Sequence, residues 1–109
     1  MDAGANCQRY AYAVLELFDR RVPPHRSGQL WEDESLSHPE RNDAQDLDLV
    51  LFNDTHSAWG AHVAIVAGAR LLHLCAEEGR PALWSWNDFA TRPRYKHMVG
   101  LVRVAGNAA

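Results

Sequence analysis

The chain has 109 residues, a length typical of one compact domain, and residues 1–109 are therefore expected to form a single unit. An apolar fraction of 47% argues against general disorder, and a net charge of −3 excludes the basic surface that nucleic-acid binding requires. No apolar run approaches the roughly 20 residues that span a bilayer, so no membrane contact is expected.

Cysteine usage and the first residues bear on the compartment. Two cysteines, Cys7 and Cys75, are fewer than an extracellular disulfide scaffold normally carries. The chain begins without the basic and apolar stretches of a secretory signal. As encoded, the protein is expected in the cytoplasm, unless a dedicated export system or cell lysis releases it.

The first predicted element is a helix over residues 7–18. The large apolar residues that share a face with Cys7 recur at helical spacing: Tyr10, Ala11, Val14, Leu15 and Phe18. Asn6 is predicted to be the N-cap, because its side chain can accept an early helix N–H. This position would place the Cys7 thiol at a helix N-terminus, where the helix dipole can lower its pKa.

The remaining elements follow in chain order. A short helix is predicted over residues 27–34, and the polar, acidic stretch 32–48 is interpreted as a solvated surface loop without calcium-loop spacing. The second half is strand-like, at 49–52, 61–66, 71–75 and 96–104, with a weaker strand at 82–84 and a helical turn at 86–90. Helices followed by antiparallel strands give an α+β class.

This pattern of strands predicts that two histidines lie close together. A turn at residues 68–70 is predicted to close a hairpin, which places His62 and His73 on neighbouring strands. Because side chains alternate between the two faces of a strand, both rings could face the helix start that holds Cys7. A register slip of one residue would turn either ring away.

A thiol, a histidine and a polar orienting group are the components of nucleophilic amide chemistry. The thiolate attacks the carbonyl carbon, a neutral imidazole takes the thiol proton, and a third group fixes the tautomer and orientation of that imidazole. Cys7, His62 and His73 are the candidates for these three roles. Cys75 lacks a helix start or a paired base and is interpreted as a buried neighbour of His73.

Three ordered segments resemble the NlpC-type cysteine peptidases, a family of small papain-like cell-wall hydrolases. Residues 6–10, Asn-Cys-Gln-Arg-Tyr, are similar to the family's D-C-S-G-[FL] nucleophile motif at the start of a helix. Residues 48–52, Asp-Leu-Val-Leu-Phe, are similar to its G-D-L-V-F-F strand, with Leu47 in place of the glycine. Residues 61–68 and 71–73 are similar to its H-V-G-I-Y-x-G and x-I-H strands.

This resemblance implies a fold and a set of roles. The fold would be a minimal papain-like one, with the cysteine-bearing N-terminal helix on a small curved antiparallel sheet. Cys7 would be the nucleophile, His62 the general base and His73 its orienting partner, and no metal or other cofactor would be needed. The substrate would be an amide bond in peptidoglycan-type peptides, bound near Trp59, Gly60 and Gln8. A homodimer could complete the groove.

Several alternatives stay open from the sequence. A zinc site made of Cys7, Cys75, His62 and His73 has suitable ligand types but no typical ligand spacing, and a Cys7–Cys75 disulfide is possible if the two come close. The residues after Cys7, Gln8 and Arg9, replace the family's Ser-Gly and favour a degenerate module that binds a peptide or a partner. A cytoplasmic amidase or acyltransferase acting on a small-molecule or carrier-bound acyl substrate is the third possibility.

Overall fold

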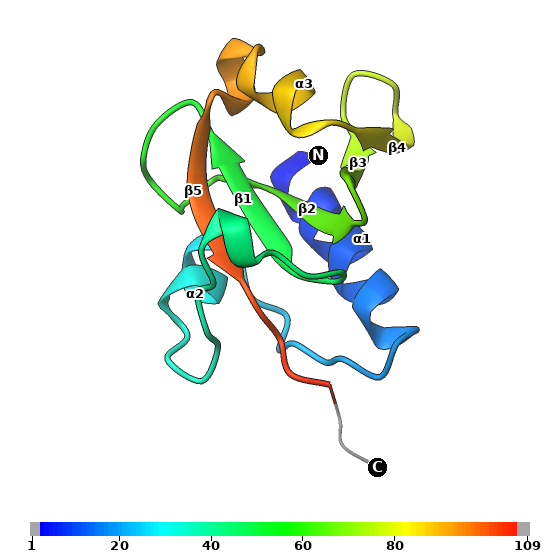
Figure 1. Cartoon of the computed structure of the whole chain (residues 1–109), viewed down its shortest axis with the longest axis vertical. Coiled ribbons are helices and arrows are strands. Elements are labelled where there is room, and N and C mark those ends of the chain that lie inside the picture. The colour runs from blue at the N-terminus through cyan, green and yellow to red at the C-terminus, as the bar shows by residue number, and fades with distance from the viewer. Residues whose placement is uncertain (1–2, 107–109) are drawn as a thin grey trace.

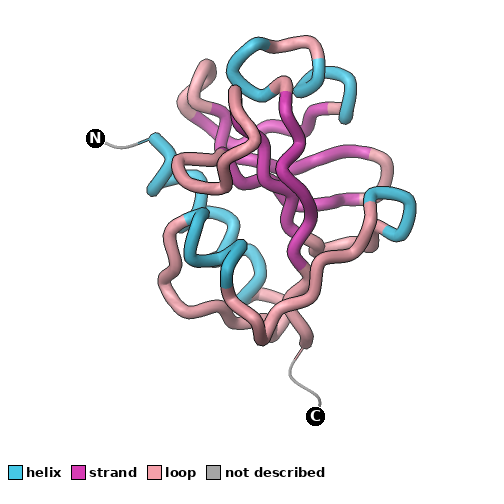
Figure 2. Tube along the Cα trace, turned by 90° about the vertical axis from the view of Figure 1, so that its left-hand side faces the viewer, coloured by secondary structure: helices cyan, strands magenta, loops and turns pink. Residues whose placement is uncertain are grey.

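The computed structural model describes residues 3–106. Five antiparallel strands form one sheet in the order β4-β3-β2-β1-β5. Helix α1 lies along one side of this sheet, and the segment that contains α3 lies at one end of it (Figures 1 and 2). The helices and strands are α1 (Ala3–Glu16), α2 (Ser27–Glu32), β1 (Leu49–Asn53), β2 (His62–Ala67), β3 (Arg70–Cys75), β4 (Arg80–Trp84), α3 (Trp86–Ala90) and β5 (His97–Val102).

The predicted α+β class is confirmed, with the cysteine-bearing helix on an antiparallel sheet. The predicted hairpin between β2 and β3 is also present. Its strands pair Ile65 with Leu72 and Ala67 with Arg70. Gly68 lies at the turn with φ 62°, a conformation that glycine adopts without steric cost. Two short 3₁₀ helices, η1 (Arg41–Asp43) and η2 (Pro93–Tyr95), were not foreseen.

The predicted start of the first helix is wrong. Helix α1 begins at Ala3, so Asn6 lies inside the helix and is not its N-cap. Alanine is the best helix former, and two alanines in the sequence Ala3-Gly4-Ala5 favour extension of the helix beyond Asn6 toward the N-terminus. Cys7 is consequently preceded by four helical residues and does not lie in the first turn, where the helix dipole acts most strongly.

The sheet separates two apolar cores, because β2 is buried on both faces. The first core lies against α1 and includes Cys7, Leu15, Leu51, Val63 and Ile65. The second core is rich in aromatic residues and includes Phe52, Ala64, Trp84, Phe89 and Tyr95. Successive residues of β2 therefore belong to different cores, as the two-residue period of a strand requires.

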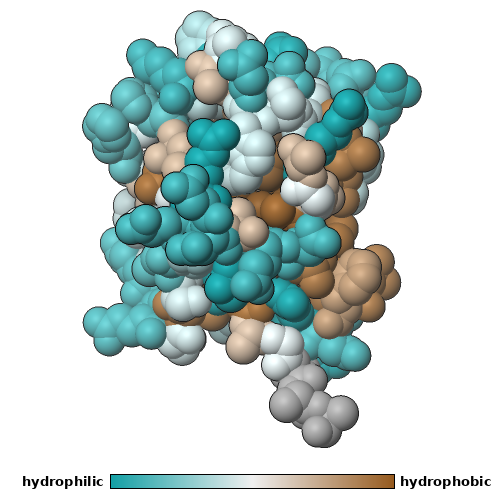
Figure 3. Space-filling model, viewed as in Figure 1, coloured by the Kyte–Doolittle hydropathy of each residue, from teal (hydrophilic) through white to brown (hydrophobic). Residues whose placement is uncertain are grey.

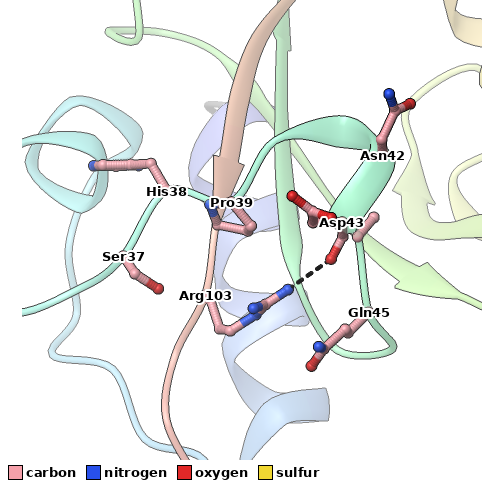
Figure 4. Close-up of a pocket in the computed structure, with 8 residues that line it drawn as sticks. Ser37, His38, Pro39, Asn42, Asp43, Gln45 and Arg103 are labelled. Atoms are coloured by element: carbon pink, nitrogen blue, oxygen red, sulfur yellow. Dashed lines mark hydrogen bonds between the residues drawn. The ribbon is translucent and has the colours of Figure 1, made fainter.

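An ion pair joins the start of β1 to the end of β5. The carboxylate of Asp48 is fully buried and accepts hydrogen bonds from Nε and Nη2 of Arg103 at 2.9 and 2.8 Å. Arg103 also donates from Nη2 to the Asp43 carbonyl at 2.9 Å, across the polar groove drawn in Figure 4. The Gln45 N–H donates to the same Asp48 carboxylate at 2.9 Å. Asp48 thus fixes the approach of the 32–48 segment to the sheet.

We expect Arg103→Leu to lower the free energy of unfolding by about 3 kcal/mol, because it leaves a buried carboxylate without its charged partner. Denaturant unfolding measures the change. The double variant Asp48→Asn/Arg103→Leu should recover part of the loss, since the buried negative charge is then absent. Equal losses in the single and double variants would contradict this account of the ion pair.

Leu47 adopts a backbone conformation that is unusual for its residue type. Its φ of 75° lies in the left-handed region, and its N–H donates to the Val66 carbonyl at 2.9 Å. Its side chain helps to line an apolar hollow near the end of α1, together with Val14, Phe18, Ile65 and Leu72. Apolar side chains gather on this side of the surface in Figure 3, where α1 lies in Figure 1.

Candidate functional site

The structure brings His62 and His73 together. Nε2 of His62 lies 2.8 Å from Nδ1 of His73, so one N–H···N hydrogen bond joins the two rings. The ring planes are nearly perpendicular, at 86°, with centroids 5.0 Å apart. The predicted neighbourhood of these two histidines is therefore present. The hairpin at Gly68 produces it, because it returns β3 beside β2.

Aromatic side chains enclose this histidine pair. The His62 ring centroid lies 5.0 Å from that of Tyr95, and the His73 centroid lies 4.8 Å from Phe89 and 4.4 Å from Trp84. Burial, together with the neighbouring His73, lowers the pKa of His62 from 6.5 to about 3. Burial likewise lowers the pKa of His73 to about 4. Both rings are consequently neutral near pH 7, and each binds a proton more weakly than a free imidazole does.

Cys7 occupies the other core. Its side chain is only 1% exposed, and the backbone N–H of Val63 donates to its sulfur at 3.4 Å. Val63 directly follows His62, so the sulfur contacts the peptide group that joins these two residues. Cys7 and Cys75 belong to different cores and are not joined by a disulfide.

The predicted common face for the thiol and the two rings is wrong. Ala61 and Val63 belong to the core that contains Cys7, whereas the His62 ring contacts Tyr95 and Phe89 of the aromatic core. Strand alternation thus directs the His62 side chain away from α1, although its backbone borders the sulfur. Transfer of a proton from Cys7 to His62 would therefore require the backbone at the start of β2 to rearrange, because rotation of a side chain does not carry it to the other face of a strand.

Trp59 lies at the surface beside the start of α2. Its side chain is 49% exposed, and its indole covers Gly28, where no side chain could fit beneath the ring. The Ala61 N–H donates to the Ser27 hydroxyl at 3.1 Å and ties the same loop to α2. Gly60, with φ 75°, turns the chain between these two anchored residues. About half of the Trp59 side chain faces solvent, and its predicted role in substrate binding stays a prediction.

The Gln8 side chain makes structural hydrogen bonds to the backbone. In the orientation of its amide that satisfies both polar atoms, the nitrogen donates to the His25 carbonyl at 3.2 Å and the oxygen accepts from the Ser27 N–H at 3.1 Å. The side chain is 7% exposed and borders a small hollow that Tyr12, Pro24 and Arg26 also line. Both polar ends of the Gln8 amide are therefore engaged by the segment that precedes α2.

A polar network beside the histidine pair was missed by the sequence analysis. The Tyr95 hydroxyl donates to Oε1 of Glu77 at 2.8 Å, and Nη1 of Arg94 lies 3.4 Å from the same oxygen. These residues are 17 and 18 positions apart from Glu77, and no sequence motif links them.

Residues 3–106 contain neither a metal-ligand cluster nor a helix able to span a membrane. This part of the chain brings together no group of three or more His, Cys, Asp and Glu side chains that could hold a metal ion, so the zinc alternative lacks its ligand cluster. Within the same residues, no helix combines the length and apolar character needed to cross a bilayer.

Comparisons with known proteins add no relative. No protein-family model matches the chain, and no curated protein matches it at a significant level.

The buried histidines predict a pH dependence of stability. The unfolded chain binds protons near pH 6.5, whereas the folded pair does so only near pH 3 to 4, so stability falls as the pH drops below 6.5. Between pH 6.5 and 5 the loss should be about 2 kcal/mol for each histidine. Carboxylates stay mostly ionised in this range. Urea unfolding at several pH values measures the loss.

His73→Asn should reduce this pH dependence, because it removes one of the two titrating rings. His56→Asn is the matched control, since His56 is exposed, and it should leave the slope unchanged. A wild-type stability that is flat from pH 6.5 to 5 would contradict the buried, neutral state of the pair.

Gly28→Ala should destabilise the protein by about 1–3 kcal/mol, because the new methyl group would fall inside the Trp59 ring. The loss should be smaller in a Trp59→Ala background, where the space is open. Gly106→Ala is the control, since the nearest atom to its added carbon is Nε of Arg20 at 3.9 Å. Denaturant midpoints compare the variants, and equal losses with and without Trp59 would disprove the contact.

Proposed function

We propose that the chain is a cysteine hydrolase that cleaves an amide bond, with Cys7 as nucleophile, His62 as general base and His73 as the group that orients His62. The hydrogen bond of 2.8 Å between the two buried, neutral imidazoles carries this proposal. A paired ring of defined tautomer is the element that a thiol nucleophile needs beside it.

The hydrogen bond also determines which nitrogen can act as the base. If Nε2–H of His62 donates to Nδ1 of His73, then Nδ1 of His62 keeps its lone pair and can accept the thiol proton. His73 then carries its own proton on Nε2. In this arrangement His73 holds His62 in the tautomer that accepts a proton, which is the role expected of the third residue of a triad.

The contact of the sulfur with Val63 supports the same assignment. A backbone N–H at 3.4 Å from Sγ would stabilise a thiolate by donating a hydrogen bond to its charge. Cys7 is only 1% exposed, within the core against α1. Catalysis would require α1 and β2 to separate locally and the backbone at the start of β2 to rearrange, so that the His62 ring faces the sulfur.

The backbone at Leu47 supports the resemblance to NlpC-type peptidases. The family motif has glycine at this position, and Leu47 adopts the left-handed conformation that glycine favours, with φ 75°. We infer from this resemblance that peptidoglycan-type peptides are the substrate class. Small-molecule amides and carrier-bound acyl thioesters are the substrates to compare with them.

A second candidate function is a catalytically inactive module that binds a peptide or a protein partner. The observation that favours it is the separation of Cys7 and His62 onto opposite faces of β2. The exposed Trp59 would then belong to the binding surface.

Alkylation of Cys7 distinguishes the two functions. Near neutral pH, iodoacetamide should modify Cys7 at least about tenfold faster in the wild type than in His62→Ala, because a paired base would raise the thiolate fraction of Cys7 above that of an ordinary thiol. Mass spectrometry of the Cys7 peptide measures the rate separately from that of Cys75. His56→Ala serves as the control and should react like the wild type. Identical rates in all three proteins would support the binding module.

A further inference from the structure

One polar atom of the histidine pair has no protein partner among the described residues. Nε2 of His73 is buried and makes no hydrogen bond there, although the residue is only 1% exposed. An unsatisfied buried polar atom costs about 1–3 kcal/mol. This nitrogen belongs to the ring that would orient His62, so the charged groups around the ring bear on the proposed site.

Glu77 lies at the border of the same aromatic cluster, with 39% of its side chain exposed to solvent. It lies in the turn between β3 and β4, and its carboxylate is held by the Tyr95 hydroxyl at 2.8 Å and by Nη1 of Arg94 at 3.4 Å. The Cys75 thiol donates to the other carboxylate oxygen at 3.4 Å. Tyr95 itself is 1% exposed, and its ring centroid lies 5.0 Å from that of His62. One buried phenol therefore touches both the carboxylate and the candidate base.

The charged groups around the histidine pair shift the pKa values of the two rings in opposite directions. Burial lowers the pKa of both histidines, and Arg94 lowers that of His62 while Arg92 lowers that of His73. Glu77 opposes this effect and raises the pKa of both rings. Glu78, one residue further along the exposed turn, raises only that of His73. Glu77 thus acts on both members of the pair.

We propose that Glu77 is the counter-ion of the histidine pair, a positioning residue that extends the triad to Glu77, His73, His62 and Cys7. When His62 accepts the proton from Sγ, the positive charge is shared within a buried aromatic cluster, where it needs a fixed negative partner. The proton later leaves His62 for the departing amine, and the pair returns to neutrality. This inference rests on the proposed function.

The test uses the full chain with Glu77→Gln. NMR titration of the Cε1–H resonances of His62 and His73 should place their protonation about one pH unit lower than in the wild type, a tenfold change in proton affinity. Alkylation of Cys7 by iodoacetamide near pH 7 should slow by about the same factor. Glu77→Asp keeps the charge, so its histidine titration midpoints and its Cys7 alkylation rate should lie close to those of the wild type.

Glu78→Gln is the matched control, because it removes one neighbouring carboxylate that makes no contact with Tyr95 among the hydrogen bonds of the described residues. It should leave the His62 titration unchanged. Equal shifts of His62 in the two glutamine variants, or none in Glu77→Gln, would overturn the proposal. If Glu77→Gln fails to fold, Tyr95→Phe provides the second test, with a smaller shift in the same direction expected and no shift contradicting the proposal.

The two readouts separate this inference from the proposed function. In one outcome, Glu77→Gln lowers the titration midpoints of the two histidines, but Cys7 alkylation does not depend on His62. This result would contradict the proposed hydrolase function and still support the coupling of Glu77 to the histidine pair. An unchanged titration, together with alkylation that does depend on His62, would overturn the role of Glu77 alone.

Discussion

Burial of β2 on both faces is the constraint on which the arrangement of the candidate site depends. Because the side chains of a strand alternate, Val63 and Ile65 complete the core against α1, while His62 and Ala64 enter the aromatic core. A shift of one residue would exchange these two sets and place an imidazole against Leu15 and Leu51. The fold therefore holds His62 beside His73 at the expense of direct contact between its ring and the thiol.

The elements of the fold were largely predictable, because their signals are local. Strand residues alternate with glycine and proline turns in the second half of the chain, and the predicted strands differ from the observed ones mainly at their ends. The helix start was mispredicted, because Asn6 resembles a cap while alanines before it favour continued helix. Competing local signals of similar strength cannot be ranked without the tertiary contacts.

The candidate site was predictable only in part. The hairpin turn at Gly68 was sufficient to bring His62 and His73 together. The face they share was not predictable, because residues 61–66 are apolar at nearly every position and provide no polar side to orient the strand. Contacts between distant residues gave no signal at all. Arg103 and Asp48 are separated by 55 positions, and Glu77 meets Tyr95 across 18.

Leu47 combines an unfavourable backbone conformation with a side chain that contributes apolar surface. A left-handed conformation costs a residue with a side chain roughly 1–2 kcal/mol, and glycine would avoid that cost. Yet the leucine contributes apolar surface to the hollow beside Phe18 and Ile65, which glycine would leave empty. The two terms have opposite signs. The depth of this hollow can therefore be altered by a substitution at this single position, because the backbone gain offsets part of the loss of apolar contact.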